Sequence, residues 1–159
     1  MDETHARQVL SWRYEGDYSF YNPRPEDFDQ DLKSLTDQSN HYFAATNEDS
    51  VLVCYYCFGA EARVVGGDYS IEATDIGAGM RPDLIGKGLG ARFILAGMEF
   101  GRSRLGARKY RATIASFNAR ALRACARIGF VSAARFRRNI DGQEFLIMVH
   151  ESVNRFGKP

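Results

Sequence analysis

Residues 81–91, Arg-Pro-Asp-Leu-Ile-Gly-Lys-Gly-Leu-Gly-Ala, place glycines at three alternate positions, Gly86, Gly88 and Gly90, directly before an apolar segment with helical periodicity. A helix N-terminus carries unpaired backbone N–H groups and the positive end of the helix dipole. Glycine lets an anion approach that backbone without meeting a Cβ atom. The stretch therefore predicts a helix start that binds phosphate, with Lys87 as an additional cation.

The glycine spacing differs from two common nucleotide-binding motifs. The dinucleotide motif requires Gly-x-Gly-x-x-Gly, and the triphosphate loop requires four residues between its glycines followed by Lys-Ser/Thr. Residues 86–92, Gly-Lys-Gly-Leu-Gly-Ala-Arg, match neither pattern. Both nucleotide interpretations are set aside, and the phosphate is expected to belong to another kind of ligand.

A second informative segment, residues 118–130, predicts a short helix that begins at Asn118 and ends at Gly129-Phe130. The two segments together resemble the GCN5-related N-acetyltransferase (GNAT) superfamily. Gly88 and Gly90 match its acyl-CoA pyrophosphate motif, Arg/Gln-x-x-Gly-x-Gly/Ala, with Ile85 where the polar residue is usual. The downstream helix matches Asn-x-x-Ala-x-x-x-Tyr-x-x-x-Gly-Phe at Asn118, Ala121, Gly129 and Phe130, with Cys125 where tyrosine is common.

This resemblance covers roughly residues 68–150 and implies an α/β fold of mixed α+β type. A central mixed, mostly antiparallel sheet would be flanked by helices. The resemblance also implies acetyl-CoA as cosubstrate, with its pantetheine arm in a gap between two diverging strands. The implied cofactor-binding residues are Gly79, Met80 and Arg81 on the strand, Gly86, Lys87, Gly88, Leu89, Gly90, Ala91 and Arg92 at the glycine loop, and Asn118.

An amine acceptor is protonated at neutral pH and must lose a proton before it attacks a thioester, so the site needs a base. Asp75 is the first candidate, because strand alternation puts it on the same face as Gly77 and Gly79, where missing side chains would leave a groove. The alternative is that Asp75 is a strand carboxylate satisfied by a neighbouring arginine or by water.

Cys125 stands where the resembling pattern carries a tyrosine that protonates the departing thiolate. A free thiol has a pKa of about 8.5 and could donate that proton. The same helix, however, shows an ordinary buried stripe at Ala121, Leu122, Cys125 and Ile128. Both interpretations stay open, and nothing in the sequence marks a histidine partner for an acyl-cysteine intermediate.

The length and composition indicate the number of domains and argue against nucleic-acid or membrane binding. The 159 residues fit one domain, with acceptor-side helices in 1–40, a cofactor-binding core in 68–130 and a C-terminal hairpin in 130–150. The 21 basic and 20 acidic residues give a net charge of +1, which offers no broad field for nucleic acid or an anionic membrane. No apolar run approaches the roughly 18 residues of a membrane span, and no signal peptide is recognised. We expect a cytoplasmic protein, with a homodimer left open.

No metal site is expected. Cys54 and Cys57 lie three residues apart in a predicted strand, so their side chains point to opposite faces. His5, His41 and His150 are scattered singly along the chain.

The periodicity predicts the element order helix, helix, three strands, helix, strand, helix and hairpin. The expected helices are residues 2–12, 25–35, 89–105 and a short one from 118; the expected strands are 41–46, 51–58, 69–80, 110–114, 130–137 and 144–149. The first strand usual in the superfamily has no counterpart before the first helix.

The sequence thus predicts transfer of acetyl from acetyl-CoA to a primary amine by direct attack in a ternary complex. The acceptor is either a small amine, resembling a polyamine or an aminoglycoside, or the α-amine of a protein N-terminus. The aromatic residues Trp12, Tyr14, Tyr18, Phe20 and Tyr21 either wall the acceptor pocket or pack beneath the helices. The alternative from another class is a non-catalytic acyl-CoA sensor.

Overall fold

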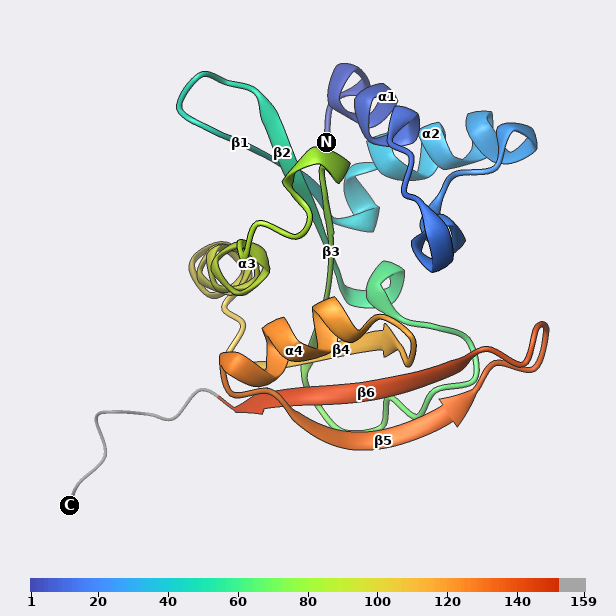
Figure 1. Cartoon of the computed structure of the whole chain (residues 1–159). Helices are drawn as coiled ribbons and strands as arrows, with labels where there is room; N and C mark the ends of the chain where they lie inside the picture. The colour runs from blue at the N-terminus through green and yellow to red at the C-terminus, as the bar shows by residue number, and fades with distance from the viewer. Residues whose placement is uncertain (152–159) are drawn as a thin grey trace.

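Six strands form one sheet in the order β1-β2-β3-β4-β6-β5 in the computed structural model, which describes residues 1–151 (Figure 1). Neighbouring strands are antiparallel except for the parallel pair β3 and β4. The predicted mixed, mostly antiparallel sheet is confirmed. The strands are β1 (Tyr42–Thr46), β2 (Leu52–Phe58), β3 (Thr74–Met80), β4 (Lys109–Ala115), β5 (Val131–Arg137) and β6 (Glu144–Glu151).

Four α-helices in the described residues 1–151 cover this sheet: α1 (Glu3–Ser11), α2 (Phe28–Thr36), α3 (Gly90–Leu105) and α4 (Ala119–Arg127). Figure 1 shows α1 and α2 on the opposite side of β1–β3 from α3. Residues of α1 and α2 form one hydrophobic cluster with Tyr42 and Tyr55 of the sheet. Residues of α3 form a second hydrophobic cluster, which contains Phe43 and Tyr56. Adjacent strand residues therefore serve opposite hydrophobic clusters, as strand alternation requires.

Local sequence fixes the ends of several helices. Asp2 caps α1 by accepting a hydrogen bond from the His5 N–H at 2.8 Å, and Asn118 caps α4 by accepting one from the Ala121 N–H at 3.1 Å. Helix α3 ends at Leu105 and is followed by Gly106, which adopts the left-handed conformation with φ of 68°. The helices predicted at these places are confirmed.

Two predicted elements differ from the structure. The strand expected at residues 69–80 begins only at Thr74, because none of residues 69–73 is paired with a neighbouring strand. The Tyr69 hydroxyl instead holds the preceding loop: it accepts from the Val64 N–H at 2.8 Å and donates to the Val64 carbonyl at 3.0 Å. Residues 12–23, called the aromatic segment below, connect the first two predicted helices without a predicted element of their own, yet they contain a 3-10 helix, η1 (Gly16–Tyr21). Within residues 1–151 no strand precedes α1, as the sequence indicates.

Strands β3 and β4 separate soon after they meet. They are paired only at Thr74 with Tyr110 and at Asp75 with Arg111. On its other edge β3 stays paired with β2 as far as Met80. A gap therefore opens on the β4 side of β3, and Ala78 is exposed although it lies within a strand at the centre of the sheet.

A buried ion pair joins the two strands at their last paired position. The Arg111 guanidinium donates to the two Asp75 carboxylate oxygens, at 2.6 and 2.9 Å, and the side chains are 2% and 1% exposed. Arg63 donates to the same carboxylate at 2.7 Å, and Arg111 also donates to the Ile71 carbonyl at 2.6 Å. Burial of these charges is tolerated because each is paired and hydrogen-bonded.

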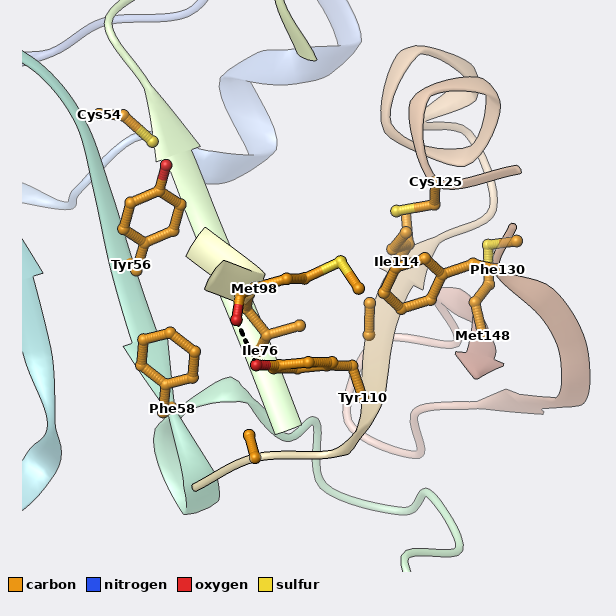
Figure 2. Packing of buried hydrophobic residues seen from close by; sticks show 12 residues of the cluster. Cys54, Tyr56, Phe58, Ile76, Met98, Tyr110, Ile114, Cys125, Phe130 and Met148 are labelled. Carbon is orange, nitrogen blue, oxygen red and sulfur yellow. Dashed lines mark hydrogen bonds between the residues drawn. The ribbon is translucent and has the colours of Figure 1, made fainter. Parts of the chain in front are cut away.

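Helix α3 lies close against β2 because its glycines leave room for large rings. A Cβ atom at Gly97 would lie 2.5 Å from the Tyr56 ring, and one at Gly101 would lie 2.9 Å from the Phe58 ring. The Tyr110 hydroxyl donates to the Met98 carbonyl in the centre of this packing (Figure 2). These contacts fix where α3 begins, which is next to the end of β3.

Removal of the Asp75 carboxylate should destabilise the fold, because Arg111 would stay buried without its main partner. For Asp75→Ala we expect a loss of about 3–5 kcal/mol in the free energy of unfolding, measured by urea denaturation. Glu72→Gln, an exposed carboxylate three residues earlier, is the matched control and should change the stability little. Equal stability of the two variants would contradict the role assigned to this ion pair.

Candidate functional site

The free edge of β3 forms one wall of the candidate site. The Arg81 N–H donates to the Val53 carbonyl of β2 at 2.9 Å, so the backbone of Arg81, and of Gly79 two residues before it, faces β2. Strand alternation turns the peptide groups of Ala78 and Met80 toward the gap instead. The expectation that the backbone of Gly79 and Arg81 faces the pantetheine arm is thereby corrected, while Met80 does face the gap.

The glycine loop follows this edge and is open to solvent. Gly86 and Gly88 have φ of 82° and 74°, and a Cβ atom added at either glycine would have nothing within 4 Å. The first bond entering α3 runs from the Phe93 N–H to the Leu89 carbonyl at 3.0 Å. The N–H groups of residues 90–92 therefore lack intrahelical acceptors, as in any first helical turn. The loop has the exposed amides and open space that a pyrophosphate group needs.

Helix α4 packs beside the start of α3. A Cβ atom at Gly90 would lie 3.2 Å from the Cβ of Ala124, so this glycine allows the two helices to approach closely. Asn118 uses its side-chain oxygen to cap α4, and its amide nitrogen donates to the Tyr21 hydroxyl at 3.2 Å. The two segments that were singled out in the sequence, residues 81–91 and 118–130, are thus brought together in space.

The aromatic segment forms a bridge between the end of β3 and the start of α4. The Tyr14 hydroxyl donates to the Met80 carbonyl at 3.0 Å. Tyr18 and Phe20 contact the Phe117 ring with centroid separations of 6.0 and 5.4 Å, and the Arg120 guanidinium lies 4.4 Å from the centre of the Tyr18 ring. The segment therefore covers the opening between the two strands.

Two cavities lie on either side of this bridge. The first, of about 410 Å³, is lined by the aromatic segment, the loop after β3 and the start of α4: Arg13, Tyr14, Glu15, Tyr18, Pro82, Asp83, Ile85 and Arg120. The second, of about 290 Å³, lies between α1, α2 and the tyrosines of β1 and β2. Tyr14 lines both cavities, so the cavity beside the glycine loop and the aromatic cavity meet at this side chain.

Asp75 lies outside both cavity linings and is held by the two arginines described above. The groove expected over the neighbouring glycines is filled, because a Cβ atom at Gly79 would lie 2.2 Å from the Tyr55 ring and one at Gly77 would lie 2.7 Å from the Cys57 sulfur. The contacts of Asp75 match the alternative given in the sequence analysis, a strand carboxylate satisfied by arginine. They give no support to Asp75 as the base.

Cys125 is buried in the core, with 3% of its surface exposed. Figure 2 shows its sulfur beside Ile114, Phe130 and Met148. Burial raises the pKa of the Cys125 thiol to about 12, because the thiolate would lose its hydration. The thiol is therefore protonated at neutral pH but shielded from solvent, and its environment matches the buried stripe seen in the sequence.

Residues 1–151 contain no cluster of three or more His, Cys, Asp or Glu side chains that could hold a metal ion. Among the helices of that same range, none combines the length and the apolar character that crossing a membrane requires. The three cysteines are free and buried.

The family model described as the acetyltransferase (GNAT) family matches residues 6–130. The chain therefore belongs to the GNAT family, and it is an N-acetyltransferase that depends on acetyl-CoA. The glycine loop described above fits the pyrophosphate of that cosubstrate, since its amides are exposed and no side chain obstructs the loop. The family resemblance seen in the sequence is confirmed.

Solved structures of similar proteins share this fold. A chimera of spermidine N-acetyltransferase SpeG from Vibrio cholerae and hSSAT is 17% identical, with a TM-score of 0.69 over 96% of this chain and 93% of that one. A GNAT-family acetyltransferase from Bacillus anthracis is 15% identical, with a TM-score of 0.71 over 96% and 92%. The ribosomal-protein-S5-alanine acetyltransferase from Vibrio fischeri is 13% identical, with a TM-score of 0.61 over 100% and 93%. A search of the curated proteins gives no match.

An anion placed in the glycine loop should repel the pyrophosphate. We expect Gly88→Glu to weaken acetyl-CoA binding by about tenfold or more, measured by calorimetry. Gly142→Glu is the matched control, because Gly142 also has positive φ and open surroundings but lies in the β5–β6 turn. Both variants place a side chain at a positive φ, 74° at position 88 and 69° at position 142, so equal affinities would argue against phosphate binding at this loop.

The buried position of Cys125 predicts a structural effect of its removal. Cys125→Ala should lower the free energy of unfolding by about 1–2 kcal/mol through the lost packing. Its kcat should change by less than about twofold, measured under saturating acetyl-CoA and acceptor. A large fall in kcat with unchanged stability would instead support Cys125 as the group that donates a proton to the departing thiolate of CoA.

Proposed function

We propose that this protein transfers acetyl from acetyl-CoA directly to a primary amine while both are bound. The observation that carries this proposal is that Tyr14 lines two cavities, one beside the glycine loop and one between α1 and α2. Two ligands bound in these cavities would meet beside the free edge of β3. Such an arrangement favours attack in a ternary complex, where positioning supplies much of the rate.

The proposed cofactor-binding groups lie on three segments. The peptide groups of Ala78 and Met80 would pair with the pantetheine arm, although the Met80 carbonyl would have to release the Tyr14 hydroxyl. The amides of residues 86–92 would hold the pyrophosphate, with Lys87 supplying a cation. Asn118 would face the same arm from α4. When bound, acetyl-CoA supplies an activated thioester; the residues named here orient it and neutralise its phosphates.

The free edge of β3 also supports the chemistry. A backbone N–H that faces the gap, such as that of Ala78, can donate to the thioester carbonyl and stabilise the oxyanion that forms during attack. Asp75 and Cys125 are each at most 3% exposed. We therefore propose that the amine loses its proton to solvent water rather than to either side chain.

The acceptor is a primary amine of one of two classes. Solved structures of similar proteins include a spermidine N-acetyltransferase and a ribosomal-protein alanine acetyltransferase, so both small amines and protein α-amines belong in the test. The acceptor side of a family fold is built largely from loops and adjoining helices, which vary more than the core does. The first experiment must therefore sample both classes.

The test is release of free thiol from acetyl-CoA across a panel of polyamines, aminoglycosides, amino acids and N-terminal peptides. We expect thiol release that depends on one class of acceptor, with the acetylated product identified by mass spectrometry. Initial rates at varied concentrations of both substrates should give intersecting double-reciprocal lines, whereas parallel lines would indicate an acyl-enzyme. A reaction without acceptor controls for hydrolysis. Tight acetyl-CoA binding with no transfer to any amine would favour the acyl-CoA sensor instead.

A further inference from the structure

The cavity between α1, α2 and the sheet combines aromatic walls with a carboxylate. Its aromatic lining comes from the aromatic segment and from β1 and β2: Trp12, Tyr14, Phe20, Tyr21, Tyr42 and Tyr55. Asp31 of α2 lines the same space. Neither Asp31 nor Tyr42 or Tyr55 was singled out by the sequence, because they lie on elements that are far apart along the chain.

The charges that line this cavity do not balance. Arg24 forms an ion pair with Asp27, and both line the cavity. Within residues 1–151, Asp31 has no ion-pair partner. Burial raises the pKa of Asp31, the Asp27 carboxylate acts in the same direction, and the Arg24 charge opposes them. The charged residues that line the cavity, Arg24, Asp27 and Asp31, thus carry one net negative charge, which favours binding of a cation.

The aromatic rings favour the same kind of ligand. The Trp12 and Tyr55 rings lie 6.0 Å apart between centroids, and the Tyr42 and Tyr55 rings 6.3 Å apart. Aromatic faces attract organic cations, while their apolar area packs against methylene groups. An anion would meet a carboxylate here, and a fully apolar ligand would leave Asp31 desolvated without a partner. An alkylammonium group satisfies both the rings and the carboxylate.

We propose that this cavity binds the second ammonium group of an acceptor that carries two or more amines on an apolar stem, such as a linear diamine or polyamine. This inference rests on the proposed function, since it names the acceptor class of that same site. Tyr14 lines the cavity and also contacts the free edge of β3 at Met80. A diamine held by Asp31 at one end can therefore extend its other amine toward that edge.

The size of the cavity agrees with this assignment. About 290 Å³ is at the lower end of small-molecule sites and suits a short, slender ligand. The backbone of a protein N-terminus presents a single α-ammonium, which is the reacting group itself, so a second cation for Asp31 would have to come from a basic side chain of that protein. The diamine is thus the acceptor that uses every feature of the cavity.

The test compares a linear diaminoalkane with the monoaminoalkane of equal carbon number, in the wild type and in Asp31→Asn. The wild type should prefer the diamine, and Asp31→Asn should raise the KM for the diamine about tenfold or more, because a charge-assisted contact is lost. The kcat/KM for the monoamine and the KM for acetyl-CoA should stay within about twofold of the wild type. Asp29→Asn, an exposed carboxylate on the same helix and outside the cavity lining, is the matched control.

Two further measurements separate the inference from the function on which it rests. Calorimetric titration of the diamine into the wild type and Asp31→Asn reports cavity binding even if no transfer occurs, so weakened binding in the variant alone would support the site without the reaction. Retained diamine preference in Asp31→Asn would overturn the inference and leave the acetyltransferase standing, as would a wild type that acetylates only N-terminal peptides. Matching melting temperatures of the variants show that each is folded.

Discussion

The ion pair between Asp75 and Arg111 is the constraint on which the rest of this structure depends. It joins β3 and β4 at their last common register, and beyond it each strand follows its other neighbour. Two charges with 1% and 2% exposure require this geometry, because an unpaired buried charge is costly. The gap that begins at this point exposes a strand edge in the middle of the sheet, which is where an extended ligand can bind through backbone hydrogen bonds.

The other parts of the site are arranged around that gap by packing. Glycines in α3 let the helix sit on the rings of β2, so its N-terminus lies just beyond the end of β3. The aromatic segment contacts Met80 at the end of β3 through Tyr14 and Phe117 before α4 through Phe20. Its Tyr14 side chain lies between the two cavities. One cavity adjoins the loop that follows β3, and the other contains Asp31, a carboxylate without an ion-pair partner among the described residues. Under the proposed function, this separation would give each substrate an environment suited to its own charge.

The glycine loop and the helix from Asn118 were accessible from the sequence because their determinants are local. Glycine spacing, helix periodicity and an N-capping asparagine each act within a few residues, so the loop at residues 86–90 and the helix from Asn118 were predicted correctly. The residues chosen for catalysis depended on distant partners. The face of Asp75 follows from alternation, but its arginine partner lies 36 residues away and a second arginine lies 12 residues away. Neither contact has a signal in the local pattern.

The sequence by itself determined the order of helices and strands, the family, and the position of a glycine-rich helix start at residues 86–90. These features follow from short-range periodicity and from the conformational freedom of glycine. The tertiary structure alone decided which backbone groups of β3 face the gap, that Tyr55 fills the space over Gly79, and that Asp31 shares a cavity with aromatic rings from three separate segments. The reason is physical: burial, ion pairing and cavity shape arise from contacts between residues that only the fold brings together.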